Sequence, residues 1–137
     1  MRSRPAIPGP DTAGALSVLP APTRLYDSRP GFTPDSGQKG LLEPGPPLVI
    51  DAKGNGSGVP AHAKALAVNI TVTGGTSDGY LVAYPDGQPT PAASSINWST
   101  GQTVANGLIV GLGPDEKVAL ATSSPVHVVI DVSGYYL

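Results

Sequence analysis

The sequence predicts an all-β domain, a β-sandwich or barrel of about 7–9 short antiparallel strands with an extended proline-rich N-terminal arm. Apolar residues alternate with polar or small ones in short runs, which is the pattern of half-buried strands. Nowhere do apolar residues recur at helical spacing over three turns. Gly and Pro, 18 and 16 of the 137 residues, separate the runs as turns.

Residues 1–22 are expected to form the extended arm, and residues 23–137 a single β domain. Prolines at positions 5, 8, 10, 20 and 22 exclude a helix in the arm and favour extended conformations. We expect the arm to be held by the protein's own body, a sister subunit or a larger assembly. Its candidate assembly residues are Arg2, Arg4, Pro5, Ile7, Pro8, Leu16 and Val18.

The central strand is expected at residues 65–73, A-L-A-V-N-I-T-V-T. Its strict alternation places Leu66, Val68, Ile70 and Val72 on one face, and the burial of these side chains contributes about 6–12 kcal/mol. The other strands are expected at residues 23–27, 48–52, 79–84, 94–98, 104–112, 117–121 and 126–132, with a long irregular loop at 32–47.

The charge content argues against several classes of partner. Only 13% of the residues are charged and the net charge is −2, so neither nucleic acid nor a membrane is an expected partner. There is no cysteine, and no apolar run approaches the length of a membrane-spanning helix.

No catalytic residue, cofactor or metal ion is expected, and the chain is not expected to be an enzyme. His127 and Asp131 lie four residues apart on one strand, about 13 Å, which is too far for shared metal ligation. No nucleophile motif of the G-x-S-x-G type occurs. A hydrolase remains an alternative only if a deep pocket surrounds Asp27 or Asp131.

Arg24, Asp27 and Arg29 are the candidate charge cluster. An aspartate between two arginines, in a region otherwise poor in charge, indicates charge-assisted hydrogen bonds. We interpret the cluster as a structural clamp on the first strand, with ligand recognition as the alternative.

Tyr80, Tyr84 and Trp98 are the candidate glycan-contacting residues of the alternative function. Aromatic faces suit stacking on sugars, although such residues more often lie in a core or an interface.

Five segments occur in a fixed order and together carry a family resemblance. They are P-T-R-L-Y-D-S-R-P-G, V-P-A-H-A-K-A-L-A-V-N-I-T-V-T, D-G-Y-L-V-A-Y-P-D-G, S-S-I-N-W-S-T-G-Q-T-V-A-N and V-V-I-D-V-S-G-Y-Y. The set resembles a β-rich domain common in extracellular and surface proteins of actinobacteria, often appended near the C-terminus of secreted enzymes. The resemblance spans about residues 22–136 and implies an exposed, non-catalytic accessory module.

The first residues, M-R-S-R-P-A-I-P-G-P, lack the apolar stretch of a secretion signal. We therefore expect release in a virus particle, as an actinobacteriophage version of the domain. The expected function is that of a structural virion protein, a capsid decoration or cement protein on the outside of the shell. The alternative is a secreted or cell-surface module that binds the cell wall or a carbohydrate.

The expected partners are the major capsid protein or another virion protein, and further copies of the chain. Under the alternative function the partner is a cell-surface glycan. Low charge, together with Val129 or Ile109 on the second strand faces, suggests a face covered by another subunit. A homo-oligomer is expected, a trimer by analogy with other decoration proteins.

Overall fold

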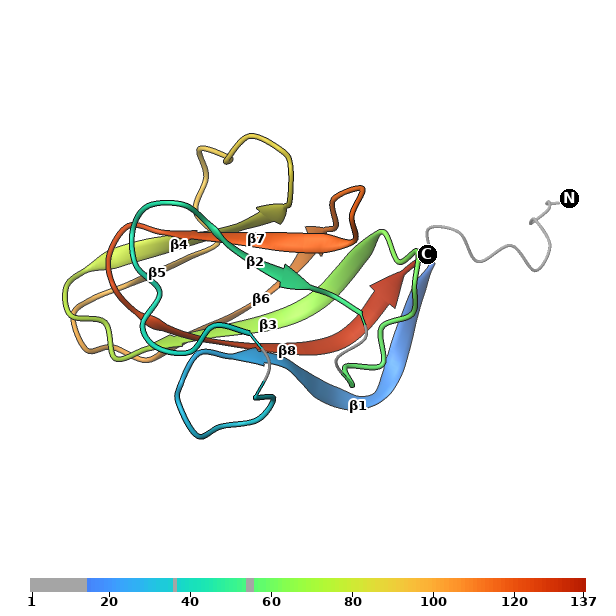
Figure 1. The fold of residues 1–137 in the computed structure, drawn as a ribbon, viewed down its shortest axis with the longest axis horizontal. Helices are drawn as coiled ribbons and strands as arrows, with labels where there is room; N and C mark the ends of the chain where they lie inside the picture. The colour runs from blue at the N-terminus through green and yellow to red at the C-terminus, as the bar shows by residue number, and fades with distance from the viewer. Residues whose placement is uncertain (1–14, 36, 54–55) are drawn as a thin grey trace, which may run out of the picture.

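A computed structural model of the chain describes residues 15–35, 37–53 and 56–137, and these form a β-sandwich without helices (Figure 1). The predicted all-β class is confirmed. No helix in the described ranges is long and apolar enough to cross a membrane. The strands are β1 (Leu16–Asp27), β2 (Leu48–Asp51), β3 (Ala65–Thr73), β4 (Gly79–Pro85), β5 (Ile96–Trp98), β6 (Val104–Gly111), β7 (Lys117–Thr122) and β8 (His127–Tyr136).

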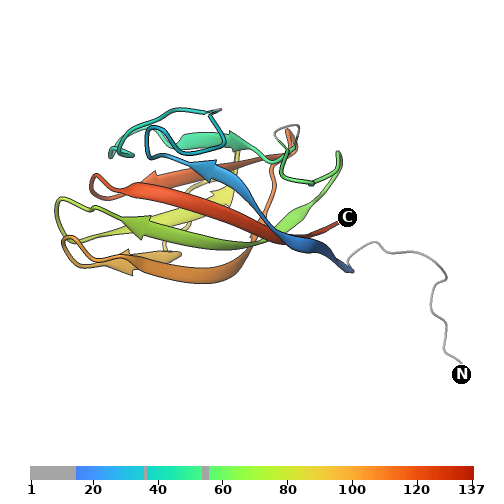
Figure 2. The same ribbon diagram turned by 90° about the horizontal axis from the view of Figure 1, so that it is seen from below.

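The eight strands form two antiparallel sheets of four strands each. The first sheet has the order β1-β8-β3-β6, and Figure 2 shows these strands side by side from β1 in blue to β6 in orange. The second sheet has the order β2-β7-β4-β5. The inward-facing side chains of both sheets form one hydrophobic core.

The central strand lies where the sequence predicts it. β3 has the predicted bounds and pairs with β8 on one side and β6 on the other. Its four alternating apolar side chains are buried, with Leu66 and Val72 at 0% exposure. The period-two alternation of β-branched residues therefore predicted both the bounds of the strand and the face that is buried.

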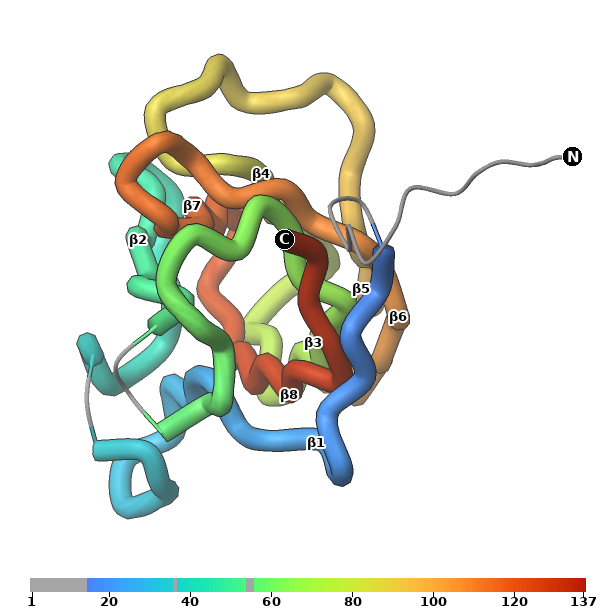
Figure 3. Tube along the Cα trace, turned by 90° about the vertical axis from the view of Figure 1, so that its right-hand side faces the viewer, coloured from blue at the N-terminus to red at the C-terminus, as the bar shows by residue number. Residues whose placement is uncertain are grey.

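The outer face of the second sheet carries a smaller apolar cluster made of Val82, Tyr84 and Ala119. The loop between β4 and β5 (yellow in Figures 1 and 3) lies outside β4 on this face. Thr90 in this loop donates a hydrogen bond to the Tyr84 hydroxyl at 3.1 Å. This contact fixes the loop over the cluster.

The first strand begins earlier than the sequence predicts. β1 starts at Leu16, so Leu16 and Val18 of the expected arm lie in the sheet, opposite Tyr136 and Gly134 of β8. Pro20 and Pro22 are tolerated because the register shifts between Val18 and Thr23 and because β1 is an edge strand. The other assembly residues, Arg2, Arg4, Pro5, Ile7 and Pro8, lie outside the described residues.

One expectation about the second strand faces is wrong. Val129 was expected to be available to another subunit, but it is only 5% exposed within the single chain. Ile109 on β6 is 56% exposed, as expected.

Candidate functional site

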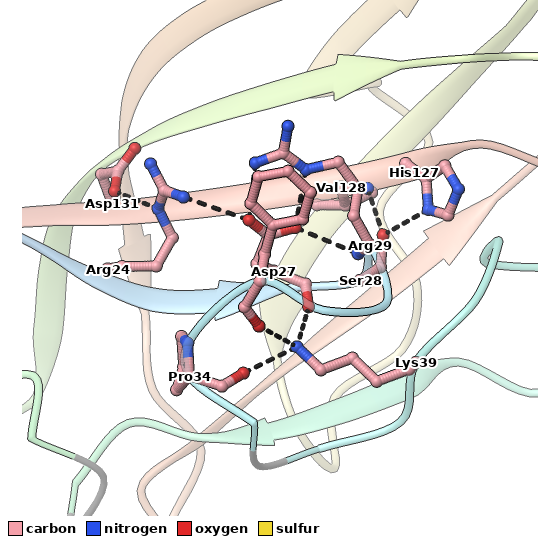
Figure 4. Close-up of polar contacts among 10 residues, drawn as sticks. Arg24, Asp27, Ser28, Arg29, Pro34, Lys39, His127, Val128 and Asp131 are labelled. Atoms are coloured by element: carbon pink, nitrogen blue, oxygen red, sulfur yellow. Dashed lines mark hydrogen bonds and ion pairs between the residues drawn. The ribbon is translucent and has the colours of Figure 1, made fainter.

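The charge cluster lies on the outer face of the first sheet, where β1 runs beside β8 (Figure 4). Arg24 is directly opposite Asp131, and Asp27 is opposite Val129. Directly opposed residues on antiparallel strands present their side chains on the same face, so the pairing of β1 with β8 brings Asp131 into the cluster.

Asp27 is the centre of the cluster, and its carboxylate is fully buried. Oδ1 accepts the backbone N–H of Arg29 at 3.0 Å and its Nε–H at 2.9 Å. Oδ2 accepts Arg29 Nη2 at 2.7 Å and Arg24 Nη1 at 3.1 Å. The predicted cluster is therefore present, and the carboxylate is saturated by N–H donors within its own chain.

Arg24 joins the two strands. Its Nε donates to Asp131 Oδ1 at 2.7 Å while its Nη1 bonds Asp27. Arg24 and Asp131 lie 107 residues apart in the sequence, so this bond links the beginning and the end of the domain.

The electrostatics of Asp27 favour a permanent charge. Burial by itself would raise the pKa of this carboxyl, but the side-chain and backbone hydrogen bonds from Arg29 and the charges of Arg29 and Arg24 outweigh it. The pKa is lowered from its ordinary value, so Asp27 is ionised at neutral pH. A group held in this way is suited to structural pairing and not to proton transfer.

Lys39 fastens the loop that follows β1, and the sequence analysis missed it. Its Nζ donates to the carbonyls of Asp27 at 2.6 Å, Phe32 at 2.9 Å and Pro34 at 2.6 Å. The Arg29 guanidinium lies 3.8 Å from the centre of the Phe32 ring, in a cation–π contact. A lone lysine in a loop rich in Gly and Pro gives no spacing signal, because its partners are backbone atoms.

Ser28 connects the same loop to β8. Its backbone N donates to the Val128 carbonyl at 2.9 Å, and its Oγ accepts the Val128 N–H at 2.8 Å. The Oγ also lies 3.0 Å from His127 Nδ1. The hydroxyl donates to Nδ1 or accepts its N–H according to the tautomer of the imidazole, and either arrangement links Ser28 to His127.

The Ser28–His127 contact has the spacing of a catalytic dyad but not its accessibility. Ser28 is 0% exposed, so its hydroxyl is closed to a substrate. Burial lowers the pKa of His127, and the charge of Arg29 lowers it further against the opposing effect of Asp27. The pair therefore links β8 to the loop, with the serine buried.

Tyr26 completes the set. Its hydroxyl donates to the Gln38 carbonyl. Burial, with a smaller effect from Asp27, raises its pKa to about 12, so it remains a neutral donor. These contacts hold the loop that follows β1, residues 28–40, in place. We call the residues that make them the loop clamp: residues 24–29 (R-L-Y-D-S-R), Lys39 and His127.

The candidate glycan-contacting residues do not form an exposed platform. Trp98 and Tyr84 are each only 5% exposed. The Trp98 ring packs against Gly79, where a Cβ would come within 2.7 Å of Cζ2, and its Nε1 donates to the Ser77 carbonyl at 3.0 Å. Of these three residues only Tyr80 is exposed, at 48%. The prediction is wrong for Trp98 and Tyr84, because both are packing residues.

A pocket of about 380 Å³ lies between loop 38–47 and β2. Its lining is mostly aliphatic and proline, with Tyr26 and Leu120 among the residues that line it, and neither Asp27 nor Asp131 is part of it. Within the described ranges, no group of three or more His, Cys, Asp or Glu residues could hold a metal ion.

A comparison with known protein families finds no family model that matches the chain, and the curated proteins give no match to it either.

Proposed function

We propose that the chain is a non-enzymatic structural protein that attaches to the outside of a bacteriophage capsid as a decoration protein. The observation that carries the proposal is the apolar start of β1. Leu16 and Val18 are 45% and 73% exposed on an edge strand, directly after the segment expected to act as an assembly arm. Large apolar side chains left in solvent at a strand edge favour contact with another surface.

The energy available from this contact is modest for one copy. Burial of Leu16 and Val18 would contribute about 1.5–3 kcal/mol each at most. Stable attachment would therefore depend on the rest of the arm and on many copies binding the same shell.

The loop clamp supports a structural role. Its ionised and polar groups are engaged in internal contacts, and its central carboxylate and hydroxyl are fully buried. Its contacts stabilise the shape of the sandwich, which suits an exposed module of the kind that the family resemblance implies.

The alternative is a module that binds a cell wall or another carbohydrate. Two exposed aromatic residues, Tyr80 at 48% and Phe32 at 47% exposure, favour this alternative. They belong to different parts of the fold, β4 and the loop after β1, so each would act as a single stacking ring.

Co-sedimentation with two particles tests the proposal: empty actinobacteriophage shells that lack the protein, and isolated actinobacterial cell walls. Val18→Asp places a charge on the exposed edge, and Val49→Asp is the matched control on β2, where Val49 is also exposed. We expect the wild type and Val49→Asp to pellet with shells, and Val18→Asp to bind at least about tenfold more weakly, the equivalent of 1.4 kcal/mol.

Two results would overturn the proposal. Binding to walls alone, lost in Tyr80→Ala, would make the chain a carbohydrate-binding module. Unchanged shell binding by Val18→Asp would show that the start of β1 is not the contact.

A further inference from the structure

β6 is an edge strand with one paired and one open side. It pairs with β3 in an unbroken register from Val72 opposite Val104 to Ala65 opposite Gly111. No other strand of the described residues pairs with it, and Figure 2 shows it in orange at the lower margin of the first sheet. Asn106 Nδ2 donates to the Ser95 carbonyl at 2.9 Å, which holds the strand against the second half of the sandwich.

The phase of the ladder shows which backbone groups face the open side. The Leu112 N–H donates to the Lys64 carbonyl at 2.8 Å, immediately after the last pair of the β3–β6 register. In an antiparallel pair, hydrogen-bonded positions alternate, so even-numbered residues of β6 bond to β3. Ala105, Gly107 and Ile109 then direct N–H and C=O groups away from the sheet, and all three residues are exposed.

Among the described edge strands, the backbones of β1, β2 and β5 are interrupted or short, whereas that of β6 is long and regular. β1 contains Pro20, Pro22 and two register shifts, while β2 and β5 have only four and three residues. β6 has eight residues, V-A-N-G-L-I-V-G, without a charge, a proline or a bulge. Natural sheets normally blunt an edge of this kind by one of those devices.

We propose that β6 pairs antiparallel with β6 of a second copy of the chain, about a two-fold axis at Gly107. The two first sheets become one continuous sheet. Gly107 lies opposite Gly107 of the partner subunit, and Ala105 lies opposite the partner's Ile109. The outward N–H and C=O groups of the three odd-numbered residues supply about six backbone hydrogen bonds across the axis.

Side-chain size favours a second copy over an unrelated strand. Ile109 is 56% exposed on the outer face, and under the two-fold axis it meets the small side chain at position 105 of the partner. A Cβ at Gly107 would meet only the Val68 carbonyl at 3.9 Å, so the centre of the contact has open space. No like charges oppose each other, because the strand carries none. The edge of β6 is therefore complementary to a second copy of itself in the antiparallel orientation.

Such a contact is isologous and closes on itself, so it gives a dimer and not the trimer expected by analogy. It does not depend on the proposed capsid attachment, which uses the opposite edge of the first sheet.

Sedimentation velocity of the full chain at 1–100 μM, about the range in which a modest interface associates, measures the dimer directly. Ile109→Lys adds a charge to the edge, and Gly107→Pro removes an outward N–H without taking a bond from β3. Val49→Lys is the control, an equivalent charge on an exposed valine of β2. We expect dimers for the wild type and Val49→Lys, and monomers with unchanged circular dichroism for Ile109→Lys and Gly107→Pro.

A crosslink locates the contact even if one of these variants fails to fold. The chain contains no cysteine, so Gly107→Cys and Val49→Cys each introduce a single thiol. A short bismaleimide should join two Gly107→Cys chains and leave Val49→Cys chains unjoined. A monomeric wild type at 100 μM, about the upper end of that range, would overturn the proposal. A dimer that survives Ile109→Lys, or that crosslinks only through position 49, would overturn it equally.

Discussion

Asp27 and Arg29 face each other through two parallel hydrogen bonds, Nε to Oδ1 at 2.9 Å and Nη2 to Oδ2 at 2.7 Å. The carboxylate is fully buried, whereas the Arg29 side chain is 31% exposed. The Arg29 guanidinium therefore remains partly hydrated, whereas the Asp27 carboxylate that it neutralises has no contact with solvent. This asymmetry makes Asp27 the more sensitive member of the pair.

Asp27→Asn should destabilise the protein by about 2–3 kcal/mol, because the amide NH₂ would face arginine donors in a buried site. Asp131→Asn, at a carboxylate that is 25% exposed and bonds Arg24, should cost less than about 1 kcal/mol. Urea unfolding of both variants measures the difference. Equal losses for the two would contradict the central position of Asp27.

His127 should make the stability depend on pH in the mildly acidic range. Its pKa is lowered in the folded protein, so folding favours the neutral imidazole. The stabilisation is complete above the unfolded pKa of 6.5 and is lost as the pH falls through the folded pKa. The free energy of unfolding should therefore fall between pH 7.5 and 5, by more in the wild type than in His127→Gln. An NMR titration that places the folded pKa of His127 above 6.5 would refute this account.

Lys39→Met should loosen loop 28–40, because three backbone carbonyls lose their shared donor. We expect a loss of about 1–3 kcal/mol and faster hydrogen exchange at the Gly40 amide, which donates to the Ser28 carbonyl. Lys64→Met, at an exposed site, is the control and should leave both quantities unchanged. Equal exchange rates at the Gly40 amide in the two variants would contradict the role of Lys39 in holding the loop.

Trp98→Ala should behave as a core mutation and cost about 3–5 kcal/mol. Tyr80→Ala, at a residue 48% exposed, should cost less than about 1 kcal/mol. Thermal unfolding of the two variants distinguishes packing from surface roles. A Trp98→Ala protein as stable as Tyr80→Ala would contradict the observed burial.

Most strands were predictable because their signal is local, although β8 continues to Tyr136, four residues past its predicted end at 132. Residues 65–73 alternate without interruption, and β3 has the predicted bounds. The start of β1 was not predictable, because Pro20 and Pro22 indicate an arm, and the register shift against β8 and the edge position of β1 accommodate them in a sheet.

The candidate site was predictable only in part. Arg24, Asp27 and Arg29 lie close together in the sequence, so their pairing could be inferred from charge alone. His127 is 99 residues from Ser28, and Lys39 bonds to backbone carbonyls, so neither leaves a local pattern. For Trp98 a signal existed: in I-N-W it shares a strand face with Ile96, and both are buried.

Electron cryomicroscopy of actinobacteriophage shells incubated with the full chain tests the proposed function most directly. The account predicts sandwich-shaped density on the outside of the shell, with the start of β1 and residues Leu16 and Val18 against the shell surface. Bare shells at saturating protein, or density attached through another face with β1 directed into solvent, would contradict it.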